Sequence, residues 1–152
     1  MAIPTAIPTK ILLEIVTPDR ALVREEADEL QLPGSEGYLG VLPGHTPLLT
    51  SLKVGELWYR VGAEKHYFAI AGGFVEILPD RVVVLAQIAE SAHEIDIARA
   101  EAAMRRAEES HQNRPPGEQR PVELALRRSQ VRLKVAQRRR ARRPGMGLHD
   151  DA

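Results

Sequence analysis

The sequence predicts a mixed β + α fold, in which an N-terminal antiparallel β-sandwich is followed by a C-terminal antiparallel two-helix hairpin. The single Trp, the three Tyr and the two Phe all precede Glu90, whereas the rest of the chain is rich in Ala, Arg and Glu. The charge divides at the same place: 7 Lys and Arg against 12 Asp and Glu up to Glu90 give −5, and 14 against 9 afterwards give +5. We therefore expect two units, a β-sandwich domain over residues 1–90 and a helical hairpin over residues 91–152.

Short segments of alternating hydrophobicity predict the strands of the first unit. In the first segment, Ile11, Leu13 and Ile15 fall on one face, which is typical of a half-buried strand. Turn residues such as Gly72-Gly73 separate the segments, a pattern that favours an antiparallel sandwich or barrel. Residues 81–88 are apolar on both faces, so we expect this strand to be central or covered on its second face. The expected strands are residues 11–17, 21–25, 29–32, 38–42, 48–52, 55–60, 65–71, 74–78 and 81–88.

Two stretches of good helix formers predict the helices of the second unit, at about residues 95–109 and 122–143. Ile95, Ala98 and Ala102 fall on one face of the first helix at helical spacing. This helix is narrow and rich in Ala, so it offers little area to bury. We therefore expect the hairpin to pack on something else or to move.

Breaks in the helical pattern separate and end these helices. Residues 115–117 (Pro-Pro-Gly) and Pro121 break the first stretch, and Pro144-Gly145 ends the second. The run Arg138–Arg143 makes the C-terminal tail basic and leaves two interpretations open, a nucleic-acid-binding arm or a solvated helix end whose charge complements the helix dipole. The second unit has no aromatic residue for base stacking, which weakens the first interpretation.

The composition excludes several chemistries. The chain has no Cys, so it has no disulfide, no thiolate metal site and no cysteine nucleophile. The five His are scattered without metal-ligand spacing, and residues 34–40 lack the Lys-Ser/Thr of a phosphate loop, so we expect neither a catalytic nor a metal site. No apolar run approaches the roughly 18 residues that a membrane span needs. The N-terminus shows no secretory signal, so we expect a protein that stays on the cytoplasmic side.

One group of charged residues suggests an anion site. Arg128 and Arg132 stand four residues apart and share a helix face. Arg99 and Arg132 lie equally far from the linker (109 − 99 and 132 − 122), so an antiparallel hairpin places them at a similar height. Converging guanidiniums repel one another unless an anion joins them, and phosphate fits such forks. The alternatives are a capping role for Asp96 at the start of the first helix and ordinary surface charges for the arginines.

Three long segments resemble the epsilon subunits of bacterial F-type ATP synthases: residues 32–50 (LPGSEGYLGVLPGHTPLLT), 69–77 (AIAGGFVEI) and 83–90 (VVLAQIAE). They keep the order and spacing of that family and, with the helical tail, cover nearly the whole chain. The resemblance implies a ten-stranded β-sandwich followed by a helical hairpin. It also implies a non-catalytic rotor subunit that binds the gamma subunit and the ring of c subunits, at the cytoplasmic face of the bacterial inner membrane.

The resemblance further implies a regulatory role. In this family the C-terminal helices fold down on the sandwich, or extend toward the catalytic head and inhibit ATP hydrolysis, and in some bacterial members the folded-down hairpin binds ATP. The loop Pro43-Gly44-His45 is implied to dock on the c-ring, with a structural role for His45 as the alternative. The signature Ile-Asp-x-x-Arg-Ala of the ATP-binding members is matched at residues 95–100. The implied ATP-binding residues are Glu90, Asp96, Arg99, Ala100, Arg128 and Arg132.

The chain departs from the nucleotide-binding relatives at residues 114–121, where those relatives have mostly helical residues. Its Arg-rich end goes beyond the usual pattern and could touch acidic surface on the catalytic head. We expect no required cofactor, ATP as a regulatory ligand, no nucleic-acid partner and membrane association only through the complex. Two alternatives stay open: a free-standing nucleotide-binding sensor that rests on the arginine group, and a nucleic-acid-binding module that rests on the terminal Arg run.

Overall fold

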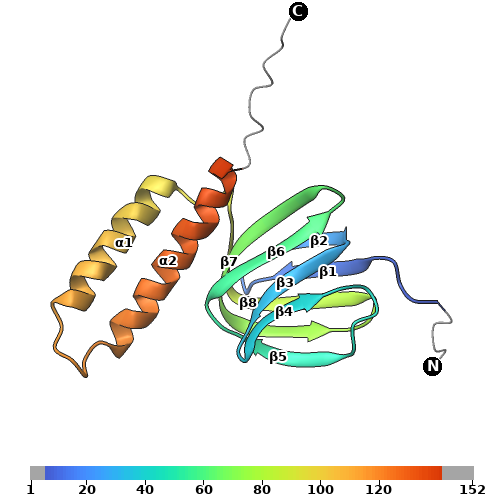
Figure 1. The fold of residues 1–152 in the computed structure, drawn as a ribbon, viewed down its shortest axis with the longest axis horizontal. Coiled ribbons are helices and arrows are strands. Elements are labelled where there is room, and N and C mark those ends of the chain that lie inside the picture. Colours follow the sequence, from blue (N-terminus) through green and yellow to red (C-terminus); the bar gives the residue numbers. More distant parts are fainter. Residues whose placement is uncertain (1–5, 142–152) are drawn as a thin grey trace, which may run out of the picture.

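A computed structural model describes the backbone of residues 6–141 and the side chains of residues 6–138. Eight strands form a sandwich, and two helices lie side by side along one flank of it (Figure 1). The strands are β1 (Ile11–Val16), β2 (Ala21–Ala27), β3 (Glu29–Gly34), β4 (Gly37–Val41), β5 (Leu48–Leu52), β6 (Gly55–Val61), β7 (Glu64–Ile77) and β8 (Arg81–Ser91). No helix within residues 6–141 is long and apolar enough to cross a membrane.

The strands pair in the order β2-β1-β8-β7-β5-β3-β4, and β6 pairs with both β3 and β7. The sequence predicted an antiparallel sandwich, and the pairs are antiparallel with one exception: β1 and β8 run parallel. These are the first and last strands of the sandwich, and they lie side by side. Alternation along a strand fixes which face is buried, but it carries no information on the direction of a neighbour.

β7 is one strand of 14 residues where the sequence predicted two, residues 65–71 and 74–78. Gly72 and Gly73, with φ of 77° and 121°, bend the strand instead of ending it. The part before the bend pairs with β6 and the part after it pairs with β5, while β8 follows both parts. Two long strands thus serve both layers, and for this reason the sandwich has eight strands and not the ten that the resemblance implied.

Alternate positions of the strands fill the core of the sandwich. Ile11, Leu13 and Ile15 are fully buried, as the pattern predicted. β8 lies between β1 and β7, so its predicted central place is confirmed, and Val84 is buried. Leu85, on the second face of β8, keeps 54% of its surface exposed, so that face is not covered by the described residues. Other fully buried core side chains are Leu30, Leu32, Val41, Leu57, Ile70, Val75, Ile77 and Val82.

The two helices, α1 (Ile97–Gln112) and α2 (Arg120–Ala141), form the predicted antiparallel hairpin. The sequence predicted that Pro121 breaks the helix, yet Pro121 lies in the first turn of α2, where a missing backbone N–H costs nothing. The break is confined to residues 113–119, where Gly117 has a φ of 101°. The predicted helix end at residue 143 and the basic tail lie outside the described residues.

α1 begins at a side-chain cap. The carboxylate of Asp96 accepts a hydrogen bond of 3.2 Å from the backbone N–H of Arg99. Ile97 and Ala100 form the buried face, whereas Ala98, which the sequence placed on it, is exposed. Of the predicted face, Ile95 is buried, but it lies before the helix. The helical spacing therefore cannot be counted from it, and for this reason the prediction for Ala98 was wrong.

The hairpin is folded down on the sandwich, with α2 between α1 and the strands (Figure 1). Tyr67, Val131 and Leu133 flank the cluster of buried side chains that joins the two parts. These buried side chains are mostly small, so the contact buries little apolar area for each residue and the polar contacts around it matter more. The buried residues of the cluster are Ala69, Ala92, Ile95, Ile97, Ala100, Val135 and Ala136.

Candidate functional site

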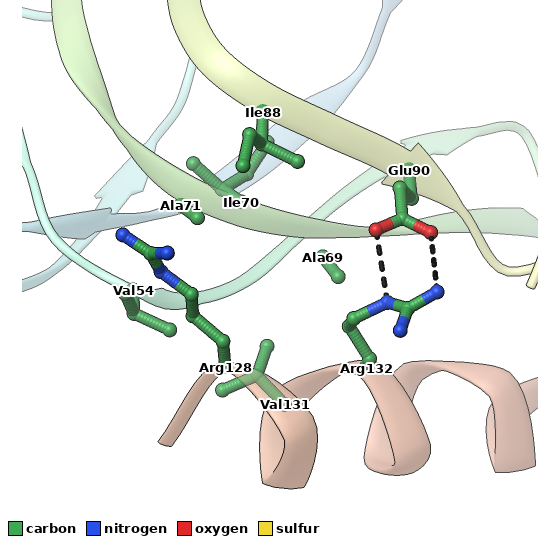
Figure 2. A pocket seen from close by; sticks show the side chains of 9 residues that line it. All are labelled: Val54, Ala69, Ile70, Ala71, Ile88, Glu90, Arg128, Val131 and Arg132. Carbon is green, nitrogen blue, oxygen red and sulfur yellow. Dashed lines mark hydrogen bonds and ion pairs between the residues drawn. The ribbon is translucent and has the colours of Figure 1, made fainter. Parts of the chain in front are cut away.

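Glu90 and Arg132 join β8 to α2. Arg132 Nη2 donates a hydrogen bond of 3.0 Å to Glu90 Oε2, and Arg132 Nε lies 2.9 Å from Glu90 Oε1 (Figure 2). Arg132 Nε is buried and its contact with Oε1 lacks good hydrogen-bond geometry, so this half of the fork is an ion pair only. Both side chains are about one-third exposed, so solvent screens part of the attraction.

A pocket lies beside this ion pair, between α2 and the sandwich (Figure 2). About 50 Å3 of it can be entered by a water-sized molecule, within about 300 Å3 of empty space that includes open solvent, so the pocket is a shallow depression. Its floor is apolar, and Glu90, Arg128 and Arg132 supply the charge at its rim. Arg128 makes no hydrogen bond or ion pair with any residue in the described part of the chain, so its guanidinium is available to a ligand. The apolar lining is Val54, Ala69, Ile70, Ala71, Ile88 and Val131.

The structure thus brings three of the six predicted site residues to one pocket and places the other three at the start of α1, with Asp96 as its cap and Arg99 and Ala100 in its first turn. Asp96 caps that helix, Arg99 is exposed, and neither lines the pocket. Ala100 is fully buried in the cluster with Val135 and Ala136, where a larger side chain would push the two helices apart. Their part in ATP binding stays a prediction.

A second fork between α2 and the sandwich was not predicted from the sequence. Arg138 donates from Nε and Nη2 to the two carboxylate oxygens of Glu56 on β6, at 3.1 and 3.0 Å. These hydrogen bonds raise the pKa of the Arg138 guanidinium, so it stays charged. The two residues are 82 positions apart, and no spacing rule connects them. Arg138 is therefore paired with Glu56 while its side chain stays 40% exposed. The side chains of the rest of the run, up to Arg143, lie outside the described residues, so the two interpretations of the run stay predictions.

The predicted docking loop lies between β4 and β5. Gly44 has a φ of 86° and donates its N–H to the carbonyl of Pro79, at 2.7 Å, which ties the loop to the turn before β8. His45 Nδ1 lies 2.6 Å from the carbonyl oxygen of Thr46. The strand register puts this loop at the end of β7 and β8 that is remote from the hairpin, because Leu48 pairs with the last residue of β7.

An apolar stripe crosses the outer face of the sandwich near this loop. Phe74 on β7 and Leu85 on β8 are direct cross-strand partners, with 59% and 54% of their surfaces exposed. Leu49 on the neighbouring strand β5 is 70% exposed. Large apolar side chains gathered on a sheet face mark an interaction surface more often than scattered ones do.

Comparison with known proteins decides the family. Two family models match the chain: the beta-sandwich domain of the ATP synthase Delta/Epsilon chain over residues 10–92, and its long alpha-helix domain over residues 93–137. ATP synthase epsilon chain 2 of Syntrophotalea carbinolica is 49% identical over 131 residues, which cover 85% of this chain and 95% of the relative. The chain belongs to the family of ATP synthase epsilon chains. The epsilon chain of Solibacter usitatus is 47% identical over 134 residues, covering 87% of this chain and 99% of the relative.

Solved structures agree with this assignment. A chain of the mitochondrial ATP synthase of Euglena gracilis, in a structure that includes the c-ring, has a TM-score of 0.76 and 26% identity and covers 90% of this chain and 86% of that one. A chain from the central stalk and c-ring of the Tetrahymena thermophila enzyme shares the fold, with a TM-score of 0.51, 14% identity and coverage of 88% and 98%. Members of this family are non-catalytic subunits of the central stalk. The predicted family and fold class are confirmed.

Proposed function

We propose that this chain regulates ATP hydrolysis in a bacterial F-type ATP synthase through the position of its helical hairpin. The observation that carries the proposal is the folded-down hairpin, which rests on small side chains and charged forks. Beside it lies a pocket whose rim holds Arg128, an arginine without a partner among the described residues. A contact of this kind is held by few interactions, so modest free energies can reverse it. In the extended form the helices would reach the catalytic head and inhibit hydrolysis.

ATP is the proposed ligand of the folded-down form. Arg128 and Arg132 would bind phosphate oxygens, and the apolar floor of the pocket would take the base. Glu90 would hold the Arg132 guanidinium in place, as it does without ligand. Arg99 would add a third guanidinium from α1, and Asp96 would fix the start of that helix through its cap.

ATP would stabilise the folded-down hairpin by its differential affinity for that form. At a ligand concentration about 100 times the dissociation constant, the gain is roughly 2.7 kcal/mol. This free energy is enough to reverse a modest preference for the extended, inhibitory form. High ATP would therefore release the enzyme from inhibition.

Two surfaces of the sandwich are proposed to bind the rotor. The loop Pro43-Gly44-His45, remote from the hairpin, would dock on the c-ring. The apolar stripe of Leu49, Phe74 and Leu85 would bind the gamma subunit, since it offers exposed apolar area on a rigid sheet. The chain would then lie at the cytoplasmic face of the bacterial inner membrane and be held there by the complex.

Calorimetric titration of the full chain with ATP tests the nucleotide site. We expect saturable heat at micromolar to millimolar ATP, and weaker binding by Arg99→Ala. The matched control is Lys134→Ala, which removes one exposed cation from α2. A lack of heat at millimolar ATP would contradict the proposed site, and equal curves for Arg99→Ala and the control would remove Arg99 from it while leaving the pocket of Arg128 and Arg132 to be tested by their own variants.

A further inference from the structure

Glu56 is the one charged side chain that is buried in the described part of the chain, with 6% of its surface exposed. Its neighbour in sequence, Leu57, points into the core of the sandwich, so Glu56 points to the opposite face of β6. On that face Glu56 pairs across the strands with Ala69, which belongs to the cluster under the hairpin. The burial of Glu56 therefore comes from α2 and would end if the hairpin left.

Arg138 is the charged partner that makes this burial tolerable. It approaches Glu56 with two nitrogens, at 3.0 and 3.1 Å, and its guanidinium carbon lies 5.1 Å from the centre of the Tyr67 ring. The fork satisfies both carboxylate oxygens, and the ring adds a cation–π contact. A buried carboxylate without such a partner costs several kcal/mol. Arg138 lies in the last described turn of α2, so the helix that buries Glu56 also supplies its charged partner.

We propose that Arg138, Glu56 and Tyr67 form a latch that holds the hairpin on the sandwich independently of nucleotide. None of the three lines the pocket, so the latch and the proposed ATP site are separate. Arg138 stands six residues beyond Arg132 on α2, about 9 Å along the helix axis. The latch rests on the proposed movement of the hairpin and sets how much of the chain is docked before ATP binds.

The two halves of the latch differ in exposure, which predicts an asymmetry. The Arg138 side chain is 40% exposed and that of Glu56 is 8% exposed. Loss of Arg138 leaves a desolvated carboxylate under α2, whereas loss of Glu56 leaves a guanidinium that still reaches water. Replacement of both by apolar side chains leaves no buried charge, and such replacements are often neutral or stabilising.

The test measures the docked-to-extended ratio of the full chain without ATP. Because the chain has no Cys, Glu36→Cys and Glu108→Cys supply two exposed labelling sites, one on the sandwich and one on α1, for a fluorescence distance measurement. We expect Arg138→Met to lower the ratio about tenfold or more, and Glu56→Met to lower it less. The double variant should return it to within about threefold of the unchanged chain. Lys134→Ala, on the exposed side of α2, is the matched control.

Two other outcomes overturn the latch. If Arg138→Met moves the hairpin no more than Lys134→Ala does, while ATP still shifts the ratio in the unchanged chain, the latch is wrong and the proposed function stands. If neither ATP nor any variant changes the ratio, both the latch and the proposed movement are wrong. Trp58 is the cross-strand partner of Tyr67, so its fluorescence would sense the latch directly. Denaturant unfolding followed by circular dichroism of the strands therefore checks in each variant that the sandwich unfolds at the same denaturant concentration.

Discussion

Arg132 of α2 pairs with Glu90 of β8 at 2.9 and 3.0 Å, whereas Arg128, one turn earlier on the same face of α2, has no partner within the described residues. Both guanidiniums reach the same pocket. One of them therefore contributes to holding the hairpin down, and the other is free to bind a ligand. Substitution of each arginine in turn can therefore distinguish nucleotide binding from docking of the hairpin.

Arg128→Ala should weaken ATP binding and leave the docked-to-extended ratio without ATP unchanged, because no described contact is lost. Arg132→Ala should weaken ATP binding and also lower that ratio. A charge-assisted hydrogen bond contributes about 1.5 to 3 kcal/mol, so we expect a loss of roughly 10- to 100-fold in affinity for each variant. Calorimetry with ATP and the labelled chain measure the two effects, and a loss of docking in Arg128→Ala would contradict the separation.

His45→Glu should weaken binding to the c-ring about tenfold, because it puts a negative charge on the proposed docking loop. The side chain is half-buried and contacts the Thr46 carbonyl, so part of the effect could fall on the loop itself. Binding to detergent-solubilised c-ring and thermal unfolding of the variant are measured side by side. A lower midpoint with unchanged binding would show that His45 is structural only.

Gly73→Ala should destabilise the sandwich by about 2 to 4 kcal/mol. The added Cβ would lie 2.1 Å from the carbonyl oxygen of Leu85 on β8, and the φ of 121° disfavours any side chain. Urea unfolding followed by Trp fluorescence gives the change in the free energy of unfolding. Gly62→Ala is the control, since its φ is 60° and its Cβ would meet nothing within 4 Å. Equal losses in the two variants would contradict a special role for the bend in β7.

Alkaline pH should destabilise the sandwich through Tyr59. Burial raises the pKa of Tyr59 well above its ordinary value of 10.0, and its hydrogen bond to Glu25 and the charge of Glu25 raise it further. The neutral phenol is therefore favoured by folding, and this stability is fully present below about pH 10 and is lost as pH rises through the folded pKa. Between pH 8 and 11 the free energy of unfolding should fall by about 1 kcal/mol from this group. Denaturant unfolding of Tyr59→Phe should show a smaller fall, and an equal fall would contradict the assignment.

The alternation of apolar residues predicted most strands and the central place of β8, because burial of one face leaves a period of two in the sequence. It failed at Gly72-Gly73, where the same residues that end strands elsewhere bend β7 within a continuous pairing. Pro121 misled for a similar reason, since proline breaks a helix interior but is accepted in a first turn. In both cases the residue type correctly marked a special backbone position, but the sequence did not show whether that position ends an element or lies within it.

The sequence predicted the local features of the candidate site and missed those that depend on tertiary packing. Arg128 and Arg132 could be placed together because spacing on one helix is a local property. Glu56 could not be connected with Arg138, since their contact depends on how α2 lies across β6 and β7. Asp96 was correctly given a capping role as its alternative, because caps are read from the few residues around a helix start.

The central claim is tested most directly by ATP hydrolysis in an assembled ATP synthase that carries either the full chain or a chain ending at His93, after β8. We expect the shortened chain to assemble with the rotor and to abolish inhibition, so that hydrolysis at low ATP is several-fold faster than with the full chain. The difference should shrink as ATP rises to millimolar concentrations, since ATP would return the hairpin to the sandwich. Equal hydrolysis rates with the two chains at every ATP concentration would contradict regulation by the hairpin.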